Sequence, residues 1–201
     1  MSSKIDPWSS EQSFDYAKLF EEFGMSKITP ELVQKLQFKL ARRGVMFAHR
    51  DLDLWLRDAE AGKPVAVMSG IKPSNEFHLG SKLTADELIF FQKRFGAKVF
   101  YAIADLEAYA DNGMALEQTH ETAVSNFADL LALGLDEKNA HVYKQSQEKR
   151  VMQMAYIFSR RATPSMLRAI YGDRNYSLYF AALAQVGDIL LPQHAAFGGS
   201  K

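Results

Sequence analysis

The chain contains no cysteine, which excludes disulfide bridges and cysteine-ligated metal sites within it. An excess of either charge is also missing, because 24 Lys and Arg residues balance 24 Asp and Glu residues. This balance argues against an overall electrostatic attraction to nucleic acid, so any RNA must be bound by a local patch. The five histidines are scattered without the spacing of a structural zinc site. We therefore expect no structural metal.

Long apolar runs are missing as well. No run approaches the roughly 18 residues of a membrane-spanning helix, and the polar residues 1–10 lack the apolar core of a signal peptide. The composition, 47% hydrophobic over 201 residues, is sufficient to bury a core. We therefore expect a globular, cytoplasmic protein without a membrane segment.

Residues 64–81, PVAVMSGIKPSNEFHLGS, form the most informative segment. The apolar run 65–68 is typical of a buried parallel strand, and Gly70 and Pro73 are turn-forming residues that we expect to end it. A helix should then begin near His78. The segment therefore predicts a strand joined through a turn to a helix, which is the arrangement of a nucleotide site.

The start of that helix carries candidate phosphate ligands. Its first N–H groups have no intrahelical acceptors, and the helix dipole is positive there. His78 at the tip, Gly80 with its small size and the Ser81 hydroxyl would together suit a phosphate. A plainer alternative stays open, in which His78 is only a helix cap or a surface residue.

The same alternation repeats twice downstream. Helical apolar spacing at 84–95 precedes an apolar strand at 99–104, and a second predicted helix at 117–133 precedes a strand at 141–146. Strands linked through helices predict a parallel sheet, and ligands bind beyond the carboxyl ends of such strands. We therefore predict an α/β fold with a Rossmann-type parallel sheet and flanking helices.

Residues 1–62 are predicted to form a helical extension in front of this sheet. Helices are expected at 15–23 and from Thr29 onward, where Thr29 is a favourable N-cap and Pro30 a favourable first residue. The charged segment 42–53 has two interpretations. Its charges either pair along a solvated helix face, or one of its arginines reaches the nucleotide.

Three acidic or amide side chains further along are candidate substrate ligands. Gln185 and Asp188 fall on one otherwise apolar face of a predicted helix, where unpaired burial would cost about 1–3 kcal/mol for each. A substrate is one partner that would remove this cost; in the alternative, both residues reach water or pair with each other. Glu107, beyond the strand at 99–104, either binds substrate or caps the next helix.

Six segments resemble the amino-terminal part of the archaeal-type tryptophanyl-tRNA synthetases. They are, in order, IDPW (5–8), DYAKLFEEFG (15–24), RRGVMFAHRDLD (42–53), SGIKPSNEFHLG (69–80), ADLEAY (104–109) and QVGDILLPQ (185–193). The resemblance implies a homodimeric class I synthetase with a Rossmann-type catalytic domain. Such an enzyme activates L-tryptophan with ATP and Mg²⁺, by attack of the tryptophan carboxylate on the α-phosphorus, and passes it to tRNA(Trp).

The resemblance also implies roles for individual residues. ATP-binding roles fall on Ser69, Gly70, His78, Gly80 and Ser81, with His78 and Ser81 as catalytic candidates, and tryptophan-binding roles fall on Met68, Glu107, Gln185 and Asp188. Lys72 is a further candidate phosphate contact, because it is a cation in the turn ahead of His78. Ser81 stands where the family usually has a second His, which removes a donor to the transferred phosphate. Met68 and Ala102 stand where eukaryotic relatives read the indole N–H, so we expect Asp188, which matches the bacterial aspartate, to accept it.

The resemblance further implies a division of the chain. It assigns 1–62 to the helical extension, 63–146 to the first half of the catalytic domain, 147–175 to a helical connecting insertion with a candidate dimer interface, and 176–201 to the start of the second half. The lysine-rich K-M-S-K-S-type loop and the anticodon-binding domain would then lie beyond this chain. From this we expect severely impaired tryptophan activation and no selective tRNA binding by these residues alone.

Three alternatives remain. A tyrosyl-tRNA synthetase shares the architecture and a stretch like 104–109, although the segments 5–8 and 42–53 favour tryptophan. A non-catalytic paralogue that binds an amino acid or a nucleotide is compatible with Ser81. In the third alternative the segment 145–170 is only a dimer interface, and no ligand site survives.

Overall fold

The computed structural model describes Phe20 and residues 24–198. The segment 5–8 and, apart from Phe20, the predicted helix at 15–23 lie outside these residues. The chain divides into two compact units, Met1–Lys63 and Pro64–Lys201, and each is described by itself. Within the described residues, no helix is both long and apolar enough to cross a membrane.

The first unit begins its helical part where the sequence predicts. The Thr29 hydroxyl accepts the N–H of Leu32 at 3.3 Å and caps a helix whose first residue is Pro30. The described elements are α2 (Pro30–Leu36), α3 (Lys39–Arg42), α4 (Leu52–Glu60), and the antiparallel pair β1 (Ser26–Lys27) and β2 (Ala48–His49). The charged segment 42–53 is therefore not one helix face, because it contains a turn, β2 and the start of α4.

The second unit is built on a three-stranded parallel sheet. Its strands, β3 (Ala66–Ile71), β4 (Lys98–Ile103) and β5 (Ala140–Lys144), lie in the order β3-β4-β5. Helix α5 (Leu79–Phe95) connects β3 to β4, and α6 (Asp105–Asn112) and α7 (Thr119–Ala132) connect β4 to β5. The predicted alternation of strands and helices, with parallel pairing, is confirmed.

The end of β3 differs from the prediction. The strand continues through Gly70 to Ile71, so Gly70 is not the residue that ends it. A Cβ at this position would lie 2.5 Å from the carbonyl oxygen of Ala102 on the neighbouring strand. Gly70 is therefore required for the close approach of two strands, which is a second common reason for glycine in a sheet.

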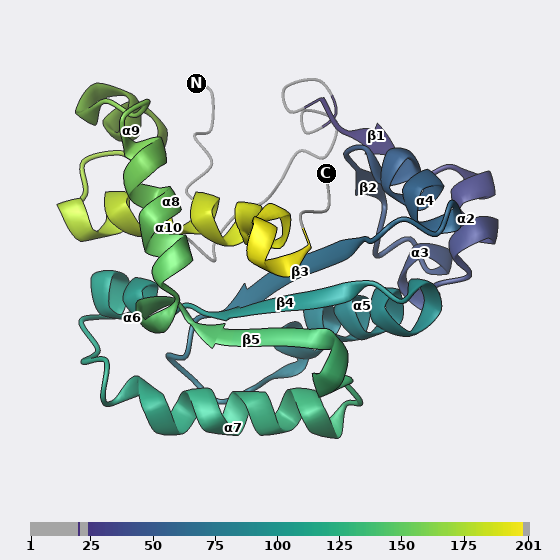
Figure 1. Ribbon diagram of the computed structural model, residues 1–201, viewed down its shortest axis with the longest axis horizontal. Coiled ribbons are helices and arrows are strands. Elements are labelled where there is room, and N and C mark those ends of the chain that lie inside the picture. The colour runs from purple at the N-terminus through teal and green to yellow at the C-terminus, as the bar shows by residue number, and fades with distance from the viewer. Residues whose placement is uncertain (1–19, 21–23, 199–201) are drawn as a thin grey trace. The chain divides into compact units, whose positions relative to one another are not determined.

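Side chains of β4 alternate between two cores, as the pleat of a strand requires. Val99, Tyr101 and Ile103 pack with side chains of α5 and α7. Phe100 and Ala102 instead pack with α8 (Lys149–Ser159) and α10 (Tyr176–Leu190). Figure 1 shows the resulting three layers, with α5 and α7 on one side of the sheet and α8 and α10 on the other.

Close packing of α8 against α10 determines where the carboxyl-terminal helix lies. A Cβ at Gly187 would lie 2.5 Å from the carbonyl oxygen of Val151, so the missing side chain lets the two helices approach. Helix α9 (Pro164–Tyr171) precedes α10, and short 3-10 turns occupy Glu137–Asn139, Gln145–Gln147, Leu191–Gln193 and Ala195–Phe197. The contact at Gly187 brings its neighbour Asp188 beside β5.

Candidate active site

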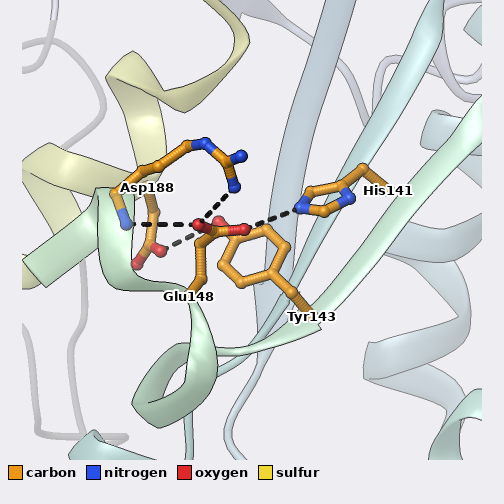
Figure 2. Close-up of polar contacts among 5 residues, drawn as sticks. His141, Tyr143, Glu148 and Asp188 are labelled. Carbon is orange, nitrogen blue, oxygen red and sulfur yellow. Dashed lines mark hydrogen bonds and ion pairs between the residues drawn. The ribbon is translucent and has the colours of Figure 1, made fainter. Parts of the chain in front are cut away.

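Asp188 lies at the centre of a buried polar cluster near the carboxyl end of β5. Its side chain is only 2% exposed. The Tyr143 hydroxyl donates to one carboxylate oxygen at 2.8 Å, and the Gln145 amide nitrogen donates to the other at 2.5 Å. Figure 2 shows the Tyr143 ring reaching across from the strand to Asp188 on the helix. Each oxygen of the carboxylate is thus held by one donor.

The environment of this carboxyl group opposes its charge. Burial raises the pKa of Asp188 to about 6, and the negative charge of Glu107 acts in the same direction. The hydrogen bonds from Gln145 and Tyr143 act against this rise. The pKa of Tyr143 also lies far above its ordinary value, mainly because of burial and secondly because of the charge of Asp188. The phenol therefore remains a donor. At neutral pH the cluster therefore presents an ionised carboxylate, which can only accept hydrogen bonds.

Gln185 does not share the buried face on which the sequence places it. It is exposed, whereas Asp188 one turn later is buried. Residues three apart on a helix are offset by roughly 60°, which is enough to carry one of them out of the core. The partners of Asp188 are Tyr143 and Gln145, so the alternative in which Gln185 and Asp188 pair with each other is also wrong.

Glu107 lies in the first turn of α6, at the carboxyl end of β4. Burial raises its pKa, the charge of Lys72 opposes this rise, and the charge of Asp111 adds to it. Lys72 is paired with Asp111 at 2.5 Å. The expected phosphate ligand Lys72 and the expected substrate ligand Glu107 are therefore electrostatic neighbours, and Glu107 acts in turn on Asp188.

The amino end of α5 begins at the predicted residue. His78 is the N-cap, and its Nδ1 accepts the N–H groups of Gly80 at 3.1 Å and Ser81 at 3.3 Å. The plainer alternative for His78, a helix cap, is what the structure contains. Both belong to the first N–H groups of the helix, which the sequence offers to a phosphate, so a phosphate bound to them would have to displace the imidazole.

The other predicted site residues lie on β3. Met68 packs against the core formed with α8 and α10, the core that also contains Ala102 and Tyr143. Ser69 follows Met68 and is half-buried. The structure thus brings Met68 and Ala102 to the sheet face that carries the phenol bound to Asp188.

Asp105, next to the candidate ligands, has a structural role. It is fully buried and accepts hydrogen bonds from the backbone N–H of Ser146 at 3.0 Å and from its hydroxyl at 2.5 Å. The N–H of Leu106 donates to it as well. Asp105 therefore ties the carboxyl end of β4 to that of β5, at the edge where ligands are expected.

Sequence reasoning missed the side chains that surround Tyr143. The His141 ring stacks on Tyr143 with centroids 5.1 Å apart and contacts Glu148 at 3.1 Å through Nε2. Glu148 also accepts from the backbone N–H and the guanidinium of Arg150, and Figure 2 shows these contacts together. Burial alone would raise the pKa of Glu148, but the hydrogen bonds from Arg150 and His141 outweigh it and lower the pKa. A sequence signal that could have found them was Gln145, a polar residue inside the strand predicted at 141–146.

A parallel sheet covered by helices on both faces, with polar groups gathered at the carboxyl ends of its strands, is the architecture of a Rossmann-type domain. The profile of the family described as tRNA synthetases class I (W and Y) matches residues 60–190. The chain belongs to this family of class I synthetases.

Individual relatives agree with this assignment. The chain is 40% identical to tryptophan–tRNA ligase of Hyperthermus butylicus, over 98% of this chain and 55% of the relative. It is also 40% identical to the Methanopyrus kandleri protein of the same name, over 94% and 52%. The crystal structure of tryptophanyl-tRNA synthetase from Aeropyrum pernix superposes with a TM-score of 0.84 at 38% identity, over 97% of this chain and 55% of that one. The chain thus spans about half the length of the curated relatives it matches.

Proposed function

We propose that this chain carries the amino-acid and nucleotide site of a tryptophan–tRNA ligase, which forms tryptophanyl-adenylate from L-tryptophan and ATP and transfers tryptophan to tRNA(Trp). The observation that carries the proposal is the buried Asp188 carboxylate at the carboxyl end of the sheet. A buried carboxylate, which can only accept hydrogen bonds, suits the single N–H of an indole ring. The identity with tryptophan–tRNA ligases supports the same substrate.

In this proposal the amino acid is held by groups from three elements. Asp188 accepts the indole N–H, and Met68 lies against the ring. Glu107, at the carboxyl end of β4, binds the substrate ammonium. Gln185 is exposed one turn before Asp188, so we assign it to the outer, polar end of the amino acid.

ATP is proposed to bind between the end of β3 and the start of α5. Ser69 and Gly70 lie near the carboxyl end of β3, on the strand side of this site, and Gly70 is exposed there. Residues Lys72, His78, Gly80 and Ser81 are proposed to bind the phosphates, with His78 and Ser81 nearest the reaction. Release of the Gly80 and Ser81 N–H groups by the imidazole would make these donors available.

The proposed reaction needs neither a general base nor a covalent enzyme intermediate. The carboxylate of tryptophan attacks the α-phosphorus in line, and the bond to pyrophosphate breaks. Catalysis then consists of aligning two anions and neutralising phosphate charge. Among the described residues, no group of three or more His, Asp or Glu side chains is arranged to hold a metal ion. We therefore assign Mg²⁺ to the substrate, bound to ATP through its phosphates.

Partners and boundaries follow from the same proposal. Segments 63–146 and 176–201 form the catalytic domain, 1–62 precedes it, and 147–175 supplies a homodimer interface. Support for that interface comes from the exposed apolar residues Tyr156 and Ile157 on α8 and Met166 and Ile170 on α9. We place the protein in the cytoplasm, where its tRNA partner is charged.

Calorimetric titration of the chain with tryptophan, tyrosine and ATP tests the proposal. We expect saturable binding of ATP, and of tryptophan at least about tenfold more tightly than tyrosine. A preference for tyrosine would assign the site to the other specificity of this family. Binding of none of the three would contradict the proposal for this chain.

A further inference from the structure

The two donors to Asp188 both come from the end of β5, and the mechanism above does not use them. Tyr143 is the fourth residue of β5, and Gln145 is the first residue after it. All three side chains are buried, with exposed fractions of 8% for Tyr143 and 2% for Gln145 and Asp188. A carboxylate offers about four lone-pair sites, so two donors leave room for a third.

We propose that Tyr143 and Gln145 are positioning residues, which keep the Asp188 carboxylate ionised and turned so that its free lone pairs meet the N–H of a bound aromatic amino acid. The inference rests on the proposed function for the identity of that ligand. The ionisation and orientation of Asp188 rest on the contacts alone.

The orientation of the Gln145 amide is fixed by chemistry. Only its NH₂ group can face a carboxylate, so its Oε1 points the other way. That oxygen is buried and finds no hydrogen-bond partner among the residues that the structure describes. An unpaired buried carbonyl costs stability, and a leucine at this position would avoid the cost. We infer that Gln145 is present for its contact with Asp188.

Tyr143 is aimed by the residues behind it. Its ring stacks on the His141 ring. His141 is hydrogen-bonded to Glu148, and Glu148 accepts a hydrogen bond from the guanidinium of Arg150 (Figure 2). The phenol is thereby limited to few orientations and can donate to Asp188 without first being ordered.

The charges around Asp188 explain why two donors are needed. Glu107 on α6 is the charged side chain that acts on Asp188 directly, and its negative charge favours protonation. The charge of Glu148 likewise raises the pKa of Tyr143. The charge of Lys72 lowers the pKa of Glu107, whereas the charge of Asp111 raises it. Burial and Glu107 both favour the protonated form of Asp188, and the hydrogen bonds from Gln145 and Tyr143 oppose them. A protonated carboxyl group has lost the charge that makes it a strong acceptor.

Two variants test the inference, Tyr143→Phe and Gln145→Leu, with Tyr101→Phe as a matched control. Tyr101 is also buried, but it lies in the opposite core with α5 and α7. The titration of Asp188 is followed by carbon-13 NMR on the chain without ligand. We expect each test variant to raise the pKa of Asp188 by about one, and the control to leave it unchanged.

Tryptophan binding is then measured by calorimetry between pH 5.5 and pH 9. We expect each test variant to bind roughly eightfold more weakly than the wild type at pH 5.5 and about twofold more weakly at pH 7, and to match the wild type at pH 9, where Asp188 is ionised in both. A loss from misfolding would not be restored by higher pH, which separates positioning from structure.

The outcomes separate the inference from the proposed function. Equal Asp188 titrations in the wild type and both test variants would overturn the inference, as would a binding loss that persists at pH 9. A third outcome is that the variants raise the pKa of Asp188 but the wild type binds no tryptophan. This would support the control of Asp188 by Tyr143 and Gln145 and would contradict the proposed function.

Discussion

At the scale of single residues, Asp188 is a group whose position costs the fold stability. Its pKa is raised by burial from 3.8 to about 6, so between these values the folded chain binds more protons than the unfolded chain. Stability must therefore fall as the pH rises from about 4 through about 6. A shift of about two corresponds to roughly 3 kcal/mol of lost stability at neutral pH. A buried carboxylate that weakens the fold is typical of a functional site.

This cost can be measured with Asp188→Asn, which removes the charge and keeps the shape. We expect the variant to gain stability relative to the wild type by about 2–3 kcal/mol between pH 4 and pH 7, because only the wild type must bury an anion. Urea denaturation at a series of pH values gives the two unfolding free energies.

Glu148→Gln is a control for which we expect the opposite dependence of stability on pH. The pKa of Glu148 is lowered, so the wild type should gain stability relative to this variant as the pH rises through the ordinary range of a glutamate. A constant difference between the wild type and Asp188→Asn across the pH range would contradict the assignment of a raised pKa to Asp188.

At the scale of elements, the start of α5 combines a structural and a proposed catalytic role in His78. The imidazole caps the helix through the N–H groups of Gly80 and Ser81, which are also the proposed phosphate donors. A cap and a phosphate therefore compete for the same groups. This competition provides a way to separate the two roles, because other side chains cap helices without carrying an imidazole.

His78→Asn tests this separation. Asparagine is a favourable N-cap, so we expect unfolding free energy within about 0.5 kcal/mol of the wild type, whereas His78→Ala should lose about 1 kcal/mol. ATP affinity, measured by calorimetry, should fall about tenfold or more in both variants, since both lack the imidazole. Unchanged ATP binding in His78→Asn would show that His78 serves only as a cap.

Local signals explain which elements the sequence predicts well. The start of α5 and the Thr29 cap depend on a few neighbouring residues, and both are confirmed. The predicted end of β3 was wrong because Gly70 is required by the nearby carbonyl of Ala102, which lies on another strand. The pair β1 and β2 was missed because two-residue strands carry no periodic pattern.

At the scale of the whole molecule, the predicted order of strands and helices and the parallel sheet are confirmed, and the family assignment follows from the match of residues 60–190. The surroundings of Asp188 were not predictable in the same way. Tyr143 and Gln145 are 45 and 43 residues away in the sequence, and only the packing of α10 over the sheet brings them together. Hydrophobic spacing predicts that such layers form, but it does not say which polar groups meet between them.

A thermodynamic cycle tests whether Asp188 accepts the N–H of tryptophan. Tryptophan and β-(3-benzothienyl)alanine, in which sulfur replaces the indole N–H, are titrated into the wild type and into Asp188→Asn. We expect the wild type to prefer tryptophan by about 10- to 100-fold, the effect of one hydrogen bond to a charged group, and the variant to lose most of that preference. An equal preference in both proteins would mean that another group reads the indole, and it would contradict the account given for this site.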